Sequence, residues 1–167
     1  MIEALTNLFE SVARRFPSVR PLFSLYYDRM CEREILAVRM QPHHRVLFIG
    51  AGAYPYSAMM YAKTGAMVTA IDRARAAVIS ASHYAHERLR FSEADGATFD
   101  MAHYDTIIIA KQVEEKQFII NQIKKTANRR VRILVRSGKS CPCAKGCALQ
   151  SLSHRGRLVK HSWMITL

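Results

Sequence analysis

The chain has no apolar run long enough to cross a bilayer, although half of its 167 residues are hydrophobic, so the sequence predicts a globular protein without a membrane span. Acidic residues are scarce: 13 Asp and Glu stand against 25 Lys and Arg, a formal charge of +12. This balance predicts attraction to something acidic without saying what. There is no internal repeat and no low-complexity tract, and the length suits one domain better than two.

Cysteine is also rare, with four residues in the chain. The first segment, MIEALTNLFESVARRF, is amphipathic and contains acidic residues, so it does not resemble a signal peptide, and we expect a cytoplasmic protein with reduced thiols. Cys141, Cys143 and Cys147 have a spacing that could share a zinc ion or an iron–sulfur cluster. The fourth ligand would have to come from far off in sequence, from Cys31 or His154. We therefore expect free thiols and no bound metal.

The basic residues are densest in KKTANRRVRILVR, residues 124–136. This run spans the end of an expected helix and the start of an expected buried strand. Lys124 and Lys125 would hydrogen-bond the carbonyls of the last helical turn and interact favourably with the helix dipole. No aromatic residues alternate with the basic ones, which weakens the case for single-stranded nucleic acid. Nucleic-acid binding is therefore not the favoured interpretation.

The stretch VLFIGAGAYP at residues 46–55 is the most informative part of the chain, together with VTAID, which ends at Asp72. Gly50 and Gly52 follow an apolar run of β type, and Asp72 ends a second such run about 20 residues later, the arrangement of a nucleoside-cofactor site. Glycine lets backbone amides approach a ligand that a Cβ would block, and the carboxylate can accept both ribose hydroxyls.

Pro55 stands where the third glycine of a dinucleotide fingerprint would fall. Proline suits the first turn of a helix but does not allow the close approach of a pyrophosphate. NAD is therefore less favoured than S-adenosylmethionine, which carries adenosine without a pyrophosphate. Most class I methyltransferases place an acidic residue two positions before the first glycine, whereas this chain has Phe48.

Apolar patterning predicts helices and strands in alternation after an N-terminal helical part. The predicted helices cover residues 2–16, 22–40, the segment after Pro55, 73–86 and 112–125. In the second of these the apolar positions include Ile35, Leu36 and Val38, and Glu32 and Glu34 lie on the remaining faces. The predicted strands cover 45–49, 67–71, 89–91, 104–110 and 131–135, and residues 158–167 would add an antiparallel strand beside the fifth. The run TIII at residues 106–109 is typical of a central parallel strand buried on both faces. We predict an α/β, Rossmann-like, class I S-adenosylmethionine-dependent methyltransferase fold with a mostly parallel sheet. Residues 1–40 would be N-terminal helices of the same domain, and residues 41–167 the cofactor-binding part.

Five stretches together resemble the nicotianamine synthase family and its bacterial and archaeal metallophore relatives: FSLYYDRMCEREIL, RVLFIGAGAYPYSAMMYA, YDTIIIAKQVEEK, RILVRSG and LVKHSWMITL. The resemblance covers most of residues 23–167, and this chain has little of the family's N-terminal helical domain. It implies a transferase that moves the 3-amino-3-carboxypropyl group of S-adenosylmethionine to an amine and releases methylthioadenosine. Metallophore biosynthesis would be the setting, with a small amine or amino acid as acceptor; a homodimer is compatible with it.

The resemblance also implies roles for individual residues. Asp95 would lie near the adenine and Ala110 at the floor of the site, while Glu34 or Glu32, with Tyr27 and Tyr56, would serve the reacting amine. Asp95 could equally be only an Asp-Gly turn, and Tyr54 and Tyr56 could be only a lid on the helix start or could orient the methionine carboxylate. The complete predicted set is Glu34, Tyr27 and Tyr56 for catalysis and Gly50, Ala51, Gly52, Tyr54, Asp72, Arg73, Asp95, Gly96 and Ala110 for the cofactor.

Two other functions remain open from the sequence. Methyl transfer to a small molecule or RNA would use the same pocket, with the acceptor approaching a different carbon of the same sulfonium. A basic, non-catalytic binding module on the same fold is the alternative outside enzymes.

Overall fold

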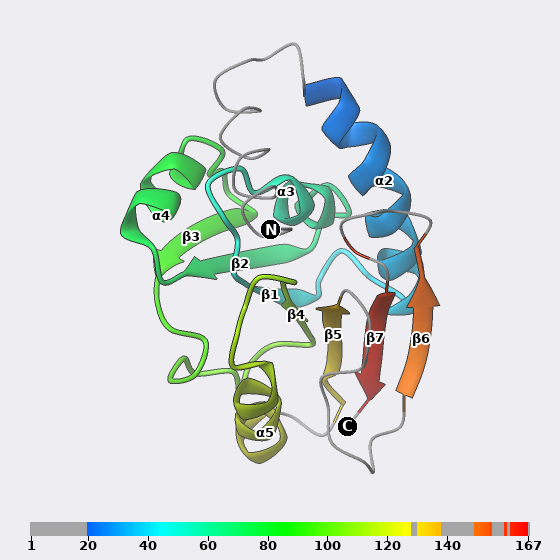
Figure 1. Cartoon of the computed structure of the whole chain (residues 1–167). Coiled ribbons are helices and arrows are strands. Elements are labelled where there is room, and N and C mark those ends of the chain that lie inside the picture. The colour runs from blue at the N-terminus through cyan, green and yellow to red at the C-terminus, as the bar shows by residue number, and fades with distance from the viewer. Residues whose placement is uncertain (1–19, 128–129, 138–148, 155–158, 160, 167) are drawn as a thin grey trace.

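The computed structural model describes residues 20–127, 130–137, 149–154, 159 and 161–166. These residues form a seven-stranded sheet in the order β3-β2-β1-β4-β5-β7-β6, with helices on both faces (Figure 1). The strands are β1 Arg45–Ile49, β2 Met67–Asp72, β3 Leu89–Glu93, β4 Thr106–Ile109, β5 Arg132–Ser137, β6 Leu149–Ser153 and β7 His161–Thr166. The helices are α2 Arg20–Ala37, α3 Tyr56–Ala62, α4 Arg75–Ser82 and α5 Lys116–Thr126.

The sheet is parallel from β3 through β5. β7 pairs antiparallel with β5, and β6 pairs antiparallel with β7, so β7 alone runs against the other strands. The predicted mostly parallel sheet with a closing antiparallel strand is confirmed. β6 was not predicted, because its sequence LQSLS carries little apolar patterning. Gln150, Ser151 and Ser153 are exposed, so this edge strand needs little apolar patterning.

Two apolar cores fill the spaces above and below the sheet. One core joins α2 and α3 to one face, and the other joins α5 to the opposite face, as the arrangement in Figure 1 shows. All four residues of β4 are buried, which confirms the central strand expected from the run Thr106-Ile107-Ile108-Ile109. The carboxyl ends of β1 and β4 therefore lie at the middle of the sheet, where ligands of such folds bind.

The face that α2 turns toward the sheet differs from the predicted one. The sequence analysis placed Leu36 on the apolar side and Glu34 on another side, but Leu36 is 76% exposed and Glu34 is fully buried. Met30, Glu34 and Val38 are four residues apart and share the buried face. The apolar pattern was misleading here because a buried arginine, described below, makes an inward carboxylate favourable. The predicted helix over residues 2–16 and the cysteines at 141, 143 and 147 lie outside the described residues.

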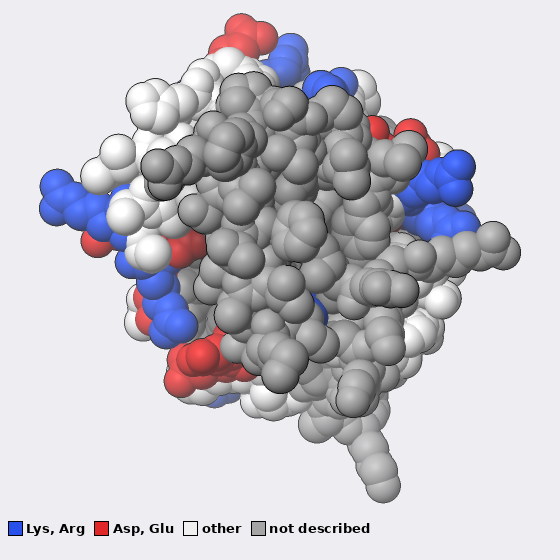
Figure 2. Space-filling model, turned by 45° about the horizontal axis from the view of Figure 1, so that its top comes forward, with Lys and Arg blue, Asp and Glu red and all other residues white. Residues whose placement is uncertain are grey.

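The described residues at the margin of the view in Figure 2 carry both signs of charge. Among the described residues visible there, basic side chains lie in separate groups around the margin, with acidic side chains beside them. Within the described ranges, no helix has both the length and the apolar character that a bilayer crossing requires.

Candidate cofactor and catalytic site

The turn after β1 has the backbone geometry that its glycines predict. Gly50 and Gly52 have φ of +81° and +69°, in the left-handed region that glycine occupies without strain. The N–H groups of Gly50 and Ala51 both donate to the carbonyl of Ile71, at 2.9 and 3.1 Å. These bonds fix the turn against the end of β2, so its backbone is held in place before any ligand binds.

Replacing Gly50 with alanine is expected to destabilise the fold by about 1–2 kcal/mol through the left-handed backbone alone. A Cβ at this position would lie 2.7 Å from Cγ2 of Val113, so a steric cost adds to the backbone strain. Urea unfolding measures the total. Adding Val113→Ala to the variant should recover the steric part and leave the strain, whereas full recovery would show that the backbone conformation costs nothing.

Asp72 connects the glycine turn to the segment that follows β2. Its Oδ2 accepts a hydrogen bond from the N–H of Gly52 at 2.9 Å, and its Oδ1 accepts one from the N–H of Ala74 at 2.9 Å. Each carboxylate oxygen can accept a second hydrogen bond, so the side chain is oriented while keeping capacity for hydroxyl donors. The structure thus fixes the predicted ribose acceptor at the tip of β2.

Two cavities open on either side of the glycine turn. Both are lined by Gly50 and Gln112, and Nε2 of Gln112 donates to the carbonyl of Gly50 at 3.0 Å between them. The first, here called the arm cavity, is lined among others by Tyr27, Phe48, Tyr56, Ala110 and Arg136. The second, the nucleoside cavity, is lined among others by Asp72, Arg73, Asp95, Gly96 and Glu115.

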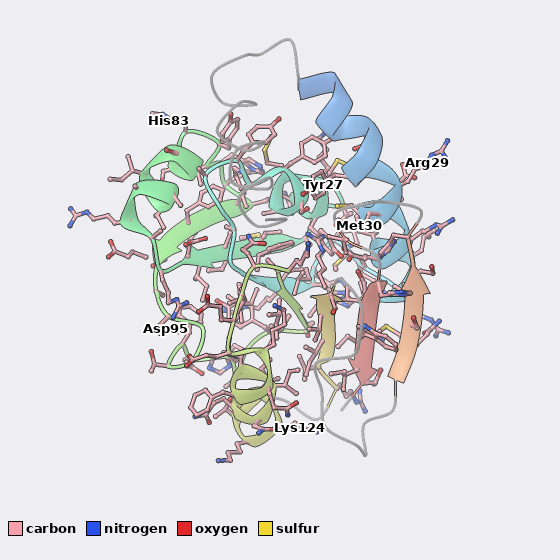
Figure 3. The ribbon with its side chains drawn as sticks, in the orientation of Figure 1. Tyr27, Arg29, Met30, His83, Asp95 and Lys124 are labelled. Carbon is pink, nitrogen blue, oxygen red and sulfur yellow. The ribbon has the colours of Figure 1, made fainter. Side chains whose placement is uncertain are left out.

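Asp95 and Gly96 form part of the wall of the nucleoside cavity. Oδ1 of Asp95 accepts a hydrogen bond from the N–H of Ala97 at 2.8 Å, so Asp95 does form the turn considered in the sequence analysis and also faces the cavity. Its loop leaves the end of β3, as Figure 3 shows. A Cβ on Gly96 would lie 2.6 Å from Cγ2 of Ile49. This close packing explains the glycine without any ligand.

Tyrosines gather at the arm cavity. Tyr54 packs with Tyr56 and Tyr84, and Tyr27 lies 6.2 Å from Tyr56 between ring centroids. Tyr27 projects from α2 toward α3, whereas Arg29 points outward from the same helix (Figure 3). The structure therefore brings the three predicted tyrosines, Tyr27, Tyr54 and Tyr56, together at one wall of one cavity.

Asp28, which the sequence analysis did not single out, is hydrogen-bonded to a residue that lines the arm cavity. Tyr56 donates its phenolic hydrogen to Oδ1 of Asp28 at 2.5 Å. Burial raises the pKa of Tyr56, and the bond to Asp28 raises it further, so the phenol is protonated at neutral pH. Asp28 follows Tyr27 in the chain, but no spacing in the sequence links it to a residue on α3. Tyr56 lines the arm cavity and Asp28 does not, so Tyr56 is the member of this carboxylate–phenol pair that can meet a proton donor in the cavity.

Glu34 lies deeper, between α2 and the sheet. Its Oε1 accepts hydrogen bonds from Nε of Arg136 at 3.0 Å and from Ser162, and its Oε2 accepts from Nη2 of Arg136 at 2.7 Å and from Tyr61. Burial would raise the pKa of Glu34, but the charge and hydrogen bonds of Arg136 outweigh it and hold the pKa below its ordinary value. Four donors fill the usual capacity of a carboxylate.

The neighbours of Glu34 clarify the choice between the two glutamates of α2. Glu32 is exposed, whereas Glu34 faces inward and pairs with Arg136, which itself lines the arm cavity. Glu34 is not among the residues that line that cavity. Its predicted role as the base stays a prediction, although a carboxylate already bound by four donors is poorly placed to receive a further proton.

Within the described residues, no three His, Cys, Asp or Glu side chains form a cluster that could hold a metal ion, and Cys141, Cys143 and Cys147 lie outside this part. Cys31 is buried beside Arg136, and burial raises the pKa of its thiol to about 11. His154 contacts Oγ of Ser162 through Nε2 at 2.8 Å. His43 and His44 precede β1, and their rings pack against each other.

Solved structures of other proteins share the fold of this chain. No family model matches the chain. No curated protein matches it either. Several solved structures do. A point mutant of MtNAS, a nicotianamine synthase, in complex with S-adenosylmethionine has a TM-score of 0.76 at 16% identity, covering 86% of this chain and 62% of its own. An RNA methyltransferase from Salinibacter ruber in complex with S-adenosyl-L-homocysteine has a TM-score of 0.67 at 12% identity, covering 83% of this chain and 89% of its own.

A third similar structure is coclaurine N-methyltransferase bound to N-methylheliamine and SAH, with a TM-score of 0.56 at 15% identity, covering 65% of this chain and 35% of its own. The chain spans about three fifths of the length of the MtNAS structures that it matches. With the strand order described above, these likenesses show that the chain has the class I S-adenosylmethionine-dependent methyltransferase fold.

Proposed function

We propose that this protein binds S-adenosylmethionine and transfers its 3-amino-3-carboxypropyl group to an amine, as a nicotianamine-synthase-like enzyme. The observation that carries the proposal is the pair of cavities that share the Gly50 turn, one lined by Asp72 and the other by Tyr56, which is hydrogen-bonded to Asp28. The first would hold the adenosine, with Asp72 on the ribose hydroxyls. The second would receive the methionine arm and the amine that attacks it.

The chemistry needs few groups from the protein. The amine nitrogen bonds to the γ-carbon of the methionine arm, the bond from that carbon to sulfur breaks, and its electrons neutralise the sulfonium as methylthioadenosine leaves. The proton of the amine must go to a base. Tyr56 can accept it while passing its own hydrogen to Asp28, because the two are already hydrogen-bonded. Positioning of amine and carbon would supply the rest of the acceleration.

Structural likeness to MtNAS, which has also been crystallised with MTA and tNA, supports the proposal. Methyl transfer is the second candidate, and the RNA methyltransferase from Salinibacter ruber favours it because this chain covers 89% of that shorter protein. Incubating the protein with S-adenosylmethionine and candidate amines, followed by mass analysis of the nucleoside product, separates the two. Methylthioadenosine above the background of spontaneous cleavage would support carboxypropyl transfer, and S-adenosylhomocysteine would mean methylation.

Asp72→Ala should weaken binding of S-adenosylmethionine by about 1–3 kcal/mol, because it removes charged acceptors for the ribose hydroxyls. Isothermal titration calorimetry measures the change. Glu93→Ala is the matched control, since Glu93 is an exposed acid at the end of the neighbouring strand β3. Equal affinities for the wild type and Asp72→Ala would remove the basis for placing the ribose at Asp72.

A further inference from the structure

The charged residues that line the two cavities differ in sign. Among the described residues that line the nucleoside cavity, three are acidic, Asp72, Asp95 and Glu115, and one is basic, Arg73. Among those that line the arm cavity, the charged residues are Lys111 and Arg136, both basic. The acidic side suits the hydrogen-bond donors of a nucleoside, namely ribose hydroxyls and an exocyclic amine. The basic side suits an anionic group attached to that nucleoside.

Arg136 is presented to this cavity in a fixed orientation. Its Nε and Nη2 make a two-pronged contact with the carboxylate of Glu34, and its guanidinium carbon lies 5.2 Å from the ring centroid of Phe48. Nη1 carries two hydrogens, and within the described part of the chain one acceptor, Oγ of Ser57, contacts it at 3.0 Å. Ser57 and Arg136 both line the arm cavity, and Nη1 is the nitrogen of the guanidinium that is not bonded to Glu34.

We propose that Arg136 binds the carboxylate of the methionine arm, with Glu34 as the residue that positions Arg136 for this contact. The inference rests on the proposed binding of S-adenosylmethionine. An arm that leaves the nucleoside cavity past Gly50 and Gln112 enters the space above Phe48 and beside Arg136. An acidic residue at position 48, as in most class I methyltransferases, would repel this carboxylate. Phe48 instead provides an apolar surface under the guanidinium. The site would thus select sulfonium nucleosides whose arm ends in a carboxylate.

Three probes test this by calorimetry: S-adenosylmethionine, its decarboxylated analogue and methylthioadenosine, which lacks the arm. The wild type should bind S-adenosylmethionine about 10–100-fold more tightly than the decarboxylated analogue, the range of one hydrogen bond between charged groups. Because Arg136→Met alone leaves Glu34 buried without its partner, the test variant also carries Glu34→Leu, which replaces the pair by apolar residues. In that variant the preference should vanish while the affinity for methylthioadenosine stays the same.

Lys111→Met is the matched control, because Lys111 is the other basic residue at the cavity and should have little effect on the preference. Each other result would overturn the inference. If the preference persists in the double variant, or if all three ligands lose the same affinity there, Arg136 has a structural role only. If the preference disappears with Lys111→Met, Lys111 binds the carboxylate instead. A wild type that binds methylthioadenosine and both other probes equally would refute the inference alone. A wild type that binds none of the three would refute the proposed function as well.

Discussion

Asp28→Asn is expected to lower turnover about 10²–10⁴-fold, the usual share of a positioned proton acceptor, while the affinity for S-adenosylmethionine hardly changes. Asparagine keeps the size of the side chain and its hydrogen bond with Tyr56, but it cannot take the proton that the phenol passes on. Tyr56→Phe should cause a similar loss. The double variant should be no slower than either single one, because the two residues act as a unit. The rate of methylthioadenosine release measures the effect.

Glu32→Gln is the matched control for Asp28→Asn, because it removes the charge of an exposed carboxylate on the same helix. Its turnover should be that of the wild type. The opposite pattern is also informative. If Asp28→Asn turns over normally and a folded Glu34→Gln does not, the base is Glu34, as the family resemblance implies, and the assignment to Asp28 is wrong.

Glu34→Ala should lower the free energy of unfolding by about 3–5 kcal/mol, because it leaves the guanidinium of Arg136 buried without its counter-charge. The hydroxyls of Tyr61 and Ser162 lose their acceptor in the same step. Urea unfolding near neutral pH measures the loss. Glu32→Ala, on the exposed side of α2, should change the same quantity by less than about 0.5 kcal/mol. Equal effects of the two substitutions would contradict the structural role of Glu34.

The pH dependence of stability gives an independent reading of the same pair. The pKa of Glu34 is lower in the folded protein than its ordinary value of 4.5. Its contribution to stability is therefore present above the unfolded pKa and is lost as the pH falls below about 4 toward the folded pKa. The wild type should lose stability in this range more steeply than Glu34→Ala. Parallel acid profiles would mean that Glu34 is not paired in the folded state.

The sequence determined much of the fold, because local signals and the tertiary structure agree over β1 to β5. The apolar runs of β1 and β4 are buried on both faces, and such runs are informative without knowledge of their neighbours. The glycine turn and Asp72 could be predicted for the same reason. Positive φ at Gly50 and a carboxylate at a strand tip depend on residues close in the chain.

The tertiary structure decided what depends on partners far apart in sequence. Asp28 contacts Tyr56, 28 residues later in the chain, only because α2 lies beside α3. Glu34 turns inward, against the apolar pattern of its helix, only because β5 supplies Arg136, 102 residues away, while Leu36 is left exposed. A buried carboxylate is favourable when a paired charge and hydrogen bonds compensate its desolvation. No periodicity within one helix contains that information.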